Sequence, residues 1–114
     1  MLRIFQQSYH VPGTLSANIN IRFAAPCDCQ LLHVSASQSD ADTAKLDIGP
    51  STDPDGYLDD ASFGISNVPA EFDRDDFVGE QYPHIPAGTI VVVTITDHGS
   101  HSADPTVVLT FAEG

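Results

Sequence analysis

The 114-residue sequence contains no tryptophan and only four basic side chains, and the shortage of basic residues excludes two classes of partner. Nucleic acids and anionic membranes bind proteins through lysine and arginine, which displace counterions from phosphate. The chain carries 16 acidic residues and a formal net charge of -12, so it is repelled by such surfaces. We therefore predict no nucleic-acid partner and no membrane partner, and we expect a basic protein surface or a cation instead.

Long apolar runs are also missing from the sequence. No segment approaches the roughly 20 apolar residues of a membrane span, and residues 1–8 lack the apolar core of a secretory signal. We expect a protein that is made and folded in a cytoplasm. The thiols Cys27 and Cys29 are too few for a disulfide scaffold and predict a reduced pair; a bridge to a neighbouring subunit or half of a metal site are the alternatives.

What the sequence does contain is alternation of apolar and polar residues with a period of two. The clearest examples are residues 18–23, 89–95 and 106–111. Strands with this period bury one face and expose the other. A chain of this length forms a single core. We therefore predict that residues 1–114 form one all-β domain, a small antiparallel β-sandwich or jelly-roll-like barrel with a long acidic connecting loop.

The same pattern predicts individual strands and their inner faces. We expect strands at residues 3–11, 16–24, 30–37, 45–48, 89–96 and 106–112. Within 30–37, Leu32, Val34 and Ala36 share one face. The first two strands are predicted to form one hairpin and the last two another.

Most of the negative charge lies in the middle of the chain. Twelve of the 16 acidic residues fall between Asp40 and Glu80, where proline and glycine interrupt the strand pattern. Residues 69–77 are predicted to form one helical turn, because proline suits a helix start and acidic residues suit its amino-terminal end. Since binding residues concentrate in loops, we expect function to reside in this acidic segment.

A calcium site is one interpretation of the acidic segment. Hard cations need convergent carboxylate oxygens, and Gly56 permits the sharp turn that would bring Asp53, Asp55 and Asp59 together. The spacing departs from the EF-hand pattern, and Asp-Pro-Asp-Gly is also ordinary turn chemistry. We predict a structural acidic turn with no cofactor, and a calcium site at these three residues as the alternative.

Residue patterns for catalysis are missing. His98 and His101 flank a short polar turn, but two histidines without nearby thiols predict exposed turn residues rather than zinc ligands. The sequence also lacks a nucleophile elbow and a phosphate-binding glycine loop. We predict no catalytic residues and no enzymatic activity.

Aromatic and charged residues alternate at the end of the acidic segment. Because protein interfaces are often anchored by aromatics and arginine inside a polar rim, the candidate contact residues are Phe72, Arg74, Phe77 and Tyr82. For Phe72 and Phe77 the alternative is that the rings close one end of the sandwich from inside.

The order of these features resembles a known family. Strand pairs at both ends of the chain flank an acidic connection with the sequence Asp53-Pro-Asp-Gly-Tyr-Leu58. The segment of residues 85–97, which contains the strongly apolar strand 89–96, and a final Val-Leu-Phe strand follow it. This arrangement resembles the head decoration, or cement, proteins of tailed bacteriophages. The resemblance implies a non-enzymatic virion protein that binds the major capsid protein on the capsid exterior. It also implies a homo-oligomer, a dimer or trimer, that ties neighbouring capsomers together.

A binding module of another class is the alternative function. The chain would then be a carbohydrate- or calcium-binding β-sandwich from a phage fibre or a bacterial surface protein. Sugar recognition usually uses exposed aromatic platforms, and the chain has three tyrosines and no tryptophan. This composition favours the capsid interpretation.

Overall fold

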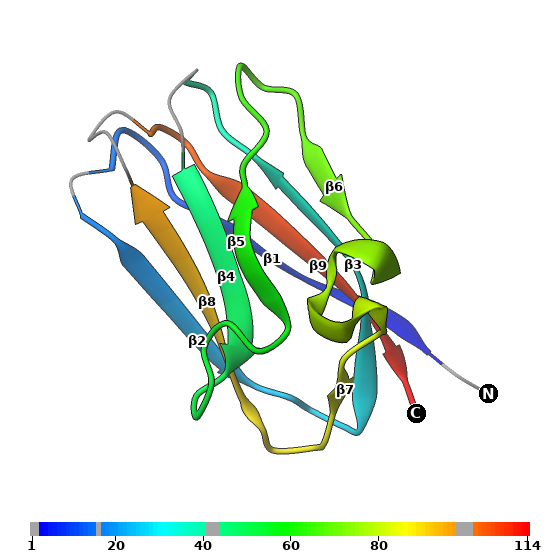
Figure 1. The fold of residues 1–114 in the computed structure, drawn as a ribbon. Coiled ribbons are helices and arrows are strands. Elements are labelled where there is room, and N and C mark those ends of the chain that lie inside the picture. The colour runs from blue at the N-terminus through cyan, green and yellow to red at the C-terminus, as the bar shows by residue number, and fades with distance from the viewer. Residues whose placement is uncertain (1–2, 16, 41–43, 98–101) are drawn as a thin grey trace.

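The computed structural model describes residues 3–15, 17–40, 44–97 and 102–114, and in it two antiparallel sheets lie face to face (Figure 1). The described residues form the strands β1 (Ile4–His10), β2 (Ile19–Ala24), β3 (Cys29–Ser37), β4 (Ala44–Pro50), β5 (Leu58–Ser62), β6 (Ala70–Phe72), β7 (His84–Ile85), β8 (Ile90–Asp97) and β9 (Thr106–Glu113). Two short 3-10 helices, η1 (Arg74–Asp76) and η2 (Val78–Glu80), lie between β6 and β7. The predicted all-β antiparallel sandwich is confirmed.

Strand order in the two sheets is interleaved along the chain. One sheet has five strands in the order β1-β9-β3-β6, with β7 also paired to β3, and the other has four in the order β2-β8-β4-β5. The chain changes sheet at most of its connections, so consecutive strands are seldom neighbours. None of the described helices is long and apolar enough to cross a membrane.

The core lies between the inner faces of the two sheets. Val91, Val93 and Ile95 of β8 and the facing residues of β9 are at most 1% exposed. Phe111 of β9 stacks on Phe5 of β1, with ring centroids 5.1 Å apart. The period of two therefore predicted the inner faces of both central strands correctly.

Both predicted hairpins are wrong. β8 and β9 lie in different sheets, where β8 pairs with β2 and β4, and β9 pairs with β1 and β3. Likewise, β1 and β2 do not pair with each other. A period of two fixes the face that a residue takes but not the neighbouring strand. The nine residues between 96 and 106 are also enough chain to span the roughly 10 Å between packed sheets.

The predicted inner face of β3 is also wrong at its start. Leu31 and Val34 are both fully buried, whereas Leu32 is partly exposed. The register of β3 against β9 shifts between Leu31 and His33. A β-bulge inserts one extra residue, so the alternation before it is inverted relative to the alternation after it.

The acidic segment is more regular than a long loop. It contains β5, which pairs with β4, and β6, which pairs with β3. The predicted helical turn within residues 69–77 exists only at its end, as η1. Neither strand shows the alternation of the core strands, because β5 has adjacent exposed acids and β6 has only three residues.

Candidate functional site

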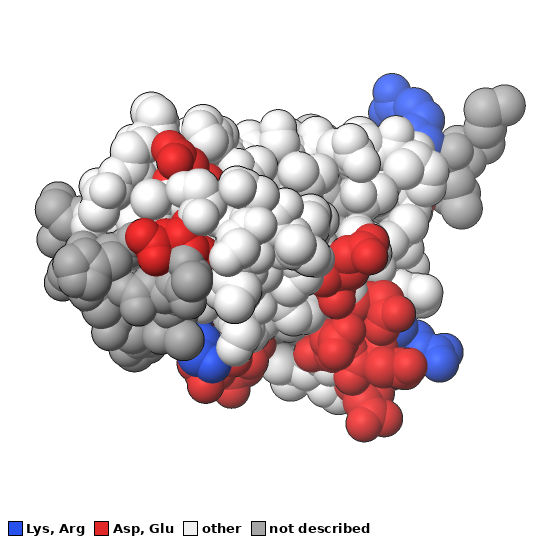
Figure 2. Space-filling view, turned by 90° about the horizontal axis from the view of Figure 1, so that it is seen from above, with Lys and Arg blue, Asp and Glu red and all other residues white. Residues whose placement is uncertain are grey.

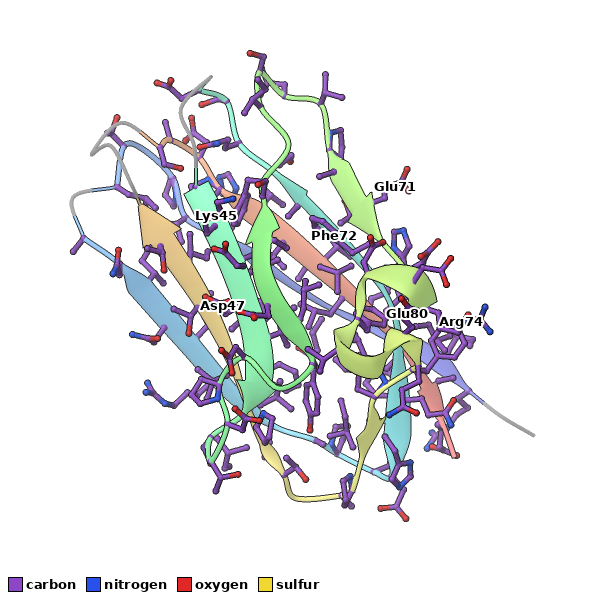
Figure 3. All side chains as sticks on the ribbon, in the orientation of Figure 1. Lys45, Asp47, Glu71, Phe72, Arg74 and Glu80 are labelled. Carbon is purple, nitrogen blue, oxygen red and sulfur yellow. The ribbon has the colours of Figure 1, made fainter. Side chains whose placement is uncertain are left out.

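Acidic side chains gather on the surface around η1 and η2 (Figure 2). We call this surface the acidic cap and define it by the exposed residues Glu71, Asp73, Asp75, Asp76 and Glu80. Figure 3 shows Glu71, Arg74 and Glu80 pointing outward from three consecutive elements, β6, η1 and η2. Because Arg74 is the one basic residue among them, the cap carries a dense negative charge.

Hydrogen bonds within the cap fix the path of its backbone. The Asp73 carboxylate accepts a hydrogen bond from the backbone N–H of Asp75 at 3.2 Å, and the Asp76 carboxylate accepts one from the backbone N–H of Asp73 at 3.0 Å. This reciprocal arrangement is a capping box. It uses two of the acids to stabilise η1, while Asp75 and Glu80 remain directed at solvent.

Buried aromatic rings anchor the acidic cap to the sandwich. Phe77 is 2% exposed and belongs to the hydrophobic core, and Phe72 is partly buried against that core. The backbone N–H of Val78 donates to the carbonyl of Tyr57 at 3.0 Å, which ties η2 to the start of β5. Residues before and after η1 therefore attach the cap to the sandwich.

The four predicted contact residues divide into two kinds. Arg74 and Tyr82 are exposed, Tyr82 to 43%. Phe77 is not available as a surface contact, because its ring fills the space between the sheets instead. Phe72 is intermediate, with its backbone paired opposite Val34 of β3.

Ion pairs leave most of the cap's charge unbalanced. Arg74 Nη2 lies 3.7 Å from Asp75 Oδ1, and His33 Nε2 lies 3.3 Å from Glu71 Oε1, a contact that is an ion pair only when the imidazole is protonated; all four side chains are exposed. Such exposed pairs contribute little to stability. The net negative charge of the cap therefore suits a cationic partner.

Exposed apolar residues lie beside these carboxylates. Val78 is 47% exposed and is separated from Tyr82 by only three residues. An apolar centre with a polar rim is the usual composition of a protein interface. Val78 was not among the contact residues predicted from the sequence, because a single valine between Phe77 and Gly79 has no periodic pattern to mark it.

The three predicted calcium ligands lie on the turn between β4 and β5 and on β5 itself. A side-chain hydrogen bond with Asp55 raises the pKa of Asp53. Burial and the nearby charge of Asp55 raise the pKa of Asp59. Within residues 3–15, 17–40, 44–97 and 102–114, no three His, Cys, Asp or Glu side chains are arranged to hold a metal ion. The acidic turn therefore brings carboxylates near each other without completing a ligand set.

Among the remaining candidate residues, the structure describes the two cysteines but not the two histidines. Cys27 and Cys29 are free thiols, and burial raises the pKa of the Cys29 thiol to about 11. A thiol with so high a pKa is a poor nucleophile at neutral pH. His98 and His101 lie outside the described residues.

Comparisons with known proteins agree with the fold. No protein-family model matches the sequence, and no curated protein matches it significantly. A chain in a solved structure titled "Cyanophage Pam1 capsid asymmetric unit" superposes with a TM-score of 0.62 and 14% sequence identity. The similarity covers 99% of this chain and 85% of that chain. This protein thus has the fold of a component of a phage capsid structure.

Proposed function

We propose that this protein is a non-enzymatic virion component that binds the major capsid protein on the outside of a phage capsid and stabilises contacts between capsomers. The observation that carries the proposal is the shared fold with a chain of the cyanophage Pam1 capsid asymmetric unit. Because 99% of this chain matches 85% of the other, the similarity extends over two small proteins of comparable length.

Strand order adds support for a capsid role. The two orders, β1-β9-β3-β6 and β2-β8-β4-β5, support a jelly roll, whose two sheets have this kind of order, if β7 is counted with β6 as one interrupted strand. Jelly rolls are frequent among viral capsid proteins. A fold alone does not specify function, so the proposal also depends on the chemistry of the protein surface.

The acidic cap suits attachment to a basic patch on a capsid. Opposite charge steers association and fixes the register of two surfaces, while Val78 and Tyr82 supply apolar contact at the same place. A protein that binds only the assembled shell stabilises that shell by its binding free energy. Decoration therefore needs no catalytic group.

Capsids prepared without this protein provide the test. Wild-type protein should co-sediment with them and raise the temperature at which they release DNA. Glu80→Lys should weaken co-sedimentation strongly, because it reverses a charge in the acidic cap. Asp55→Lys is the matched control, since it makes the same change in net charge on the exposed β4–β5 turn.

Two results would count against the proposal. Equal losses in Glu80→Lys and Asp55→Lys would indicate non-specific attraction and remove the cap from the interface. Failure of the wild-type protein to bind capsids, together with calcium-dependent binding to a glycan array, would favour the alternative of a carbohydrate- or calcium-binding module.

A further inference from the structure

The two lateral edges of the sandwich differ in how well they are protected. β1 and β2 end the two sheets on one side, and β5 and β6 end them on the other (Figure 1). The second side shows the devices by which proteins prevent edge-to-edge pairing. β6 has only three residues, β5 carries Asp59 and Asp60, and the β4–β5 register shifts between Leu46 and Ile48.

β1 has none of these protections. It is seven residues long, pairs with β9 without a register shift, and contains no proline, lysine or carboxylate. Its hydrogen bonds reveal which backbone groups are free. Glu113 N–H donates to the carbonyl of Arg3, and Val11 N–H donates to that of Pro105. The backbone N–H and C=O groups of odd-numbered residues therefore point toward β9. The backbone N–H groups of even-numbered residues, including Gln6 and Ser8, point away from the sheet.

The core is also incompletely covered at this edge. The apolar residues on the inner faces of β1 and β2 are only partly buried, namely Phe5, Tyr9, Ile19, Ile21 and Phe23. At the opposite edge Phe63 and Phe77 are buried, but Phe72 of β6 is only partly buried, and Ile65 and Val68 between β5 and β6 are exposed. Tyr9 and Phe23 contact each other across the two sheets, with centroids 6.0 Å apart, and so form a partly open aromatic seam.

Charge indicates what covers this edge. Neither β1 nor β2 contains a carboxylate, and Arg22 of β2 forms no ion pair within the described part of the chain. The net charge of each copy is -12, so two copies repel unless their acidic surfaces stay apart. Contact through β1 and β2 keeps both acidic caps on the far sides of the pair. The edge thus suits a second copy of this chain.

We propose that two copies associate through their β1 and β2 edges about a twofold axis, with antiparallel β1–β1 pairing and the two aromatic seams in contact. Such an interface is self-complementary, as twofold symmetry requires. The dimer itself does not depend on the proposed function. Its consequence for capsids does, since each dimer would present two acidic caps and bind two sites with the gain in affinity that bivalency gives.

The first experiment measures the mass of the free protein in solution. Sedimentation equilibrium should give twice the 12.2 kDa of the single chain. Gln6→Lys places a charge on the outer face of the edge strand, in place of an amide that donates to Thr110 Oγ1 at 3.1 Å. It should raise the dimer Kd by about tenfold or more, equivalent to about 1.4 kcal/mol. Gln30→Lys is the matched control, because Gln30 is exposed on β3 of the same sheet but lies next to β9 and β7. It should leave the Kd unchanged.

A second variant separates dimer loss from misfolding. Ser8→Pro removes an N–H that points away from β9, so it blocks β1–β1 pairing while leaving the internal ladder intact. It should be monomeric with a circular dichroism spectrum like that of the wild type. A monomeric wild type at millimolar concentration would overturn the proposal. So would a dimer or trimer that persists in both Gln6→Lys and Ser8→Pro.

Capsid binding distinguishes this proposal from the proposed function. If dimers form and neither the wild type nor Gln6→Lys binds capsids, the proposed function fails while the dimer stands. If the wild type is monomeric and capsids bind it through β1, so that Ser8→Pro abolishes binding, a capsid strand occupies the edge and the dimer proposal fails.

Discussion

Phe23 of β2 and Phe111 of β9 meet edge to face across the two sheets, with ring centroids 6.0 Å apart and ring planes at 76°. The contact joins an edge strand of one sheet to a central strand of the other. Phe111 also stacks on Phe5, and Phe23 also contacts Tyr9, so four aromatic rings from three strands form one group. Packing of this group holds the two sheets together on the side where β1 and β2 are the edge strands.

Removal of the Phe111 ring, which has two aromatic partners, should therefore be costly. Phe111→Ala is expected to lower the free energy of unfolding by about 3–5 kcal/mol, because it deletes a fully buried aromatic and leaves a cavity. Urea denaturation followed by circular dichroism measures the effect. Val108→Ala, on the outer face of the same strand, is the control and should cost far less. Equal losses in the two variants would show that the ring group is not the centre of the core.

A second prediction concerns the carboxylate that joins three loops at one end of the sandwich. Asp104 accepts hydrogen bonds from the backbone N–H of Gly13 at 2.7 Å and from Ser39 Oγ at 2.9 Å. The hydrogen bond from Gly13, and then that from Ser39, lower the pKa of Asp104. A lowered pKa means that the carboxylate stabilises the fold above its unfolded pKa of about 3.9, and that this contribution is lost as pH falls through the folded pKa.

Asp104→Asn should therefore lower the melting temperature at neutral pH, with a difference from the wild type that narrows below about pH 3.9. Thermal melts between pH 2 and pH 7 measure this dependence. Asp75→Asn removes an equal charge from the exposed η1 and should show no comparable effect at neutral pH. A difference that stays constant, or widens, as pH falls would contradict the role assigned to the Asp104 carboxylate.

The third prediction tests how the acidic turn is held against β4. Gly49 is buried, and a Cβ at this position would overlap the carbonyl oxygen of Asp53 and the backbone nitrogen of Gly56. Gly49→Ala should destabilise the protein by about 1–3 kcal/mol, because the overlap is with backbone that cannot rotate away. Chemical denaturation measures this. Unchanged stability would mean that the turn moves freely away from the strand.

The sequence predicted which face of a strand is buried better than it predicted which strand lies beside it. Alternation in β8 and β9 correctly predicted that Val93 and Leu109 point inward, since a buried face demands an apolar residue at every second position. Neither strand's pattern contains information on which strand lies beside it, so the hairpin between them was wrong. The bulge at Leu31 was likewise hidden, because two adjacent leucines fit either register.

The candidate site was predictable in composition but not in geometry. Clustered acids between 71 and 80 correctly indicated a charged surface, because carboxylates seldom stay buried without partners. The roles of Phe77 and Val78 were not predictable, since adjacent apolar residues in an irregular segment give no sign of which one faces the core. Exposure of β1 as a free edge depends on strand order, which a single sequence does not specify.

The last prediction separates the structural acidic turn from a calcium site. Asp55 raises the pKa of Asp53, through a shared hydrogen bond first and charge repulsion as well. A raised carboxyl pKa means that the ionised pair opposes folding above that pKa, so stability is gained as pH falls through it. Asp55→Asn removes the repulsion and should leave the melting temperature at neutral pH equal to or above that of the wild type. Calcium should change neither protein, because no three-ligand set exists among the described carboxylates. If calcium raised the melting temperature of the wild type, and Asp55→Asn lost that response, Asp53, Asp55 and Asp59 would be ligands, because a bound ion stabilises the folded state by mass action.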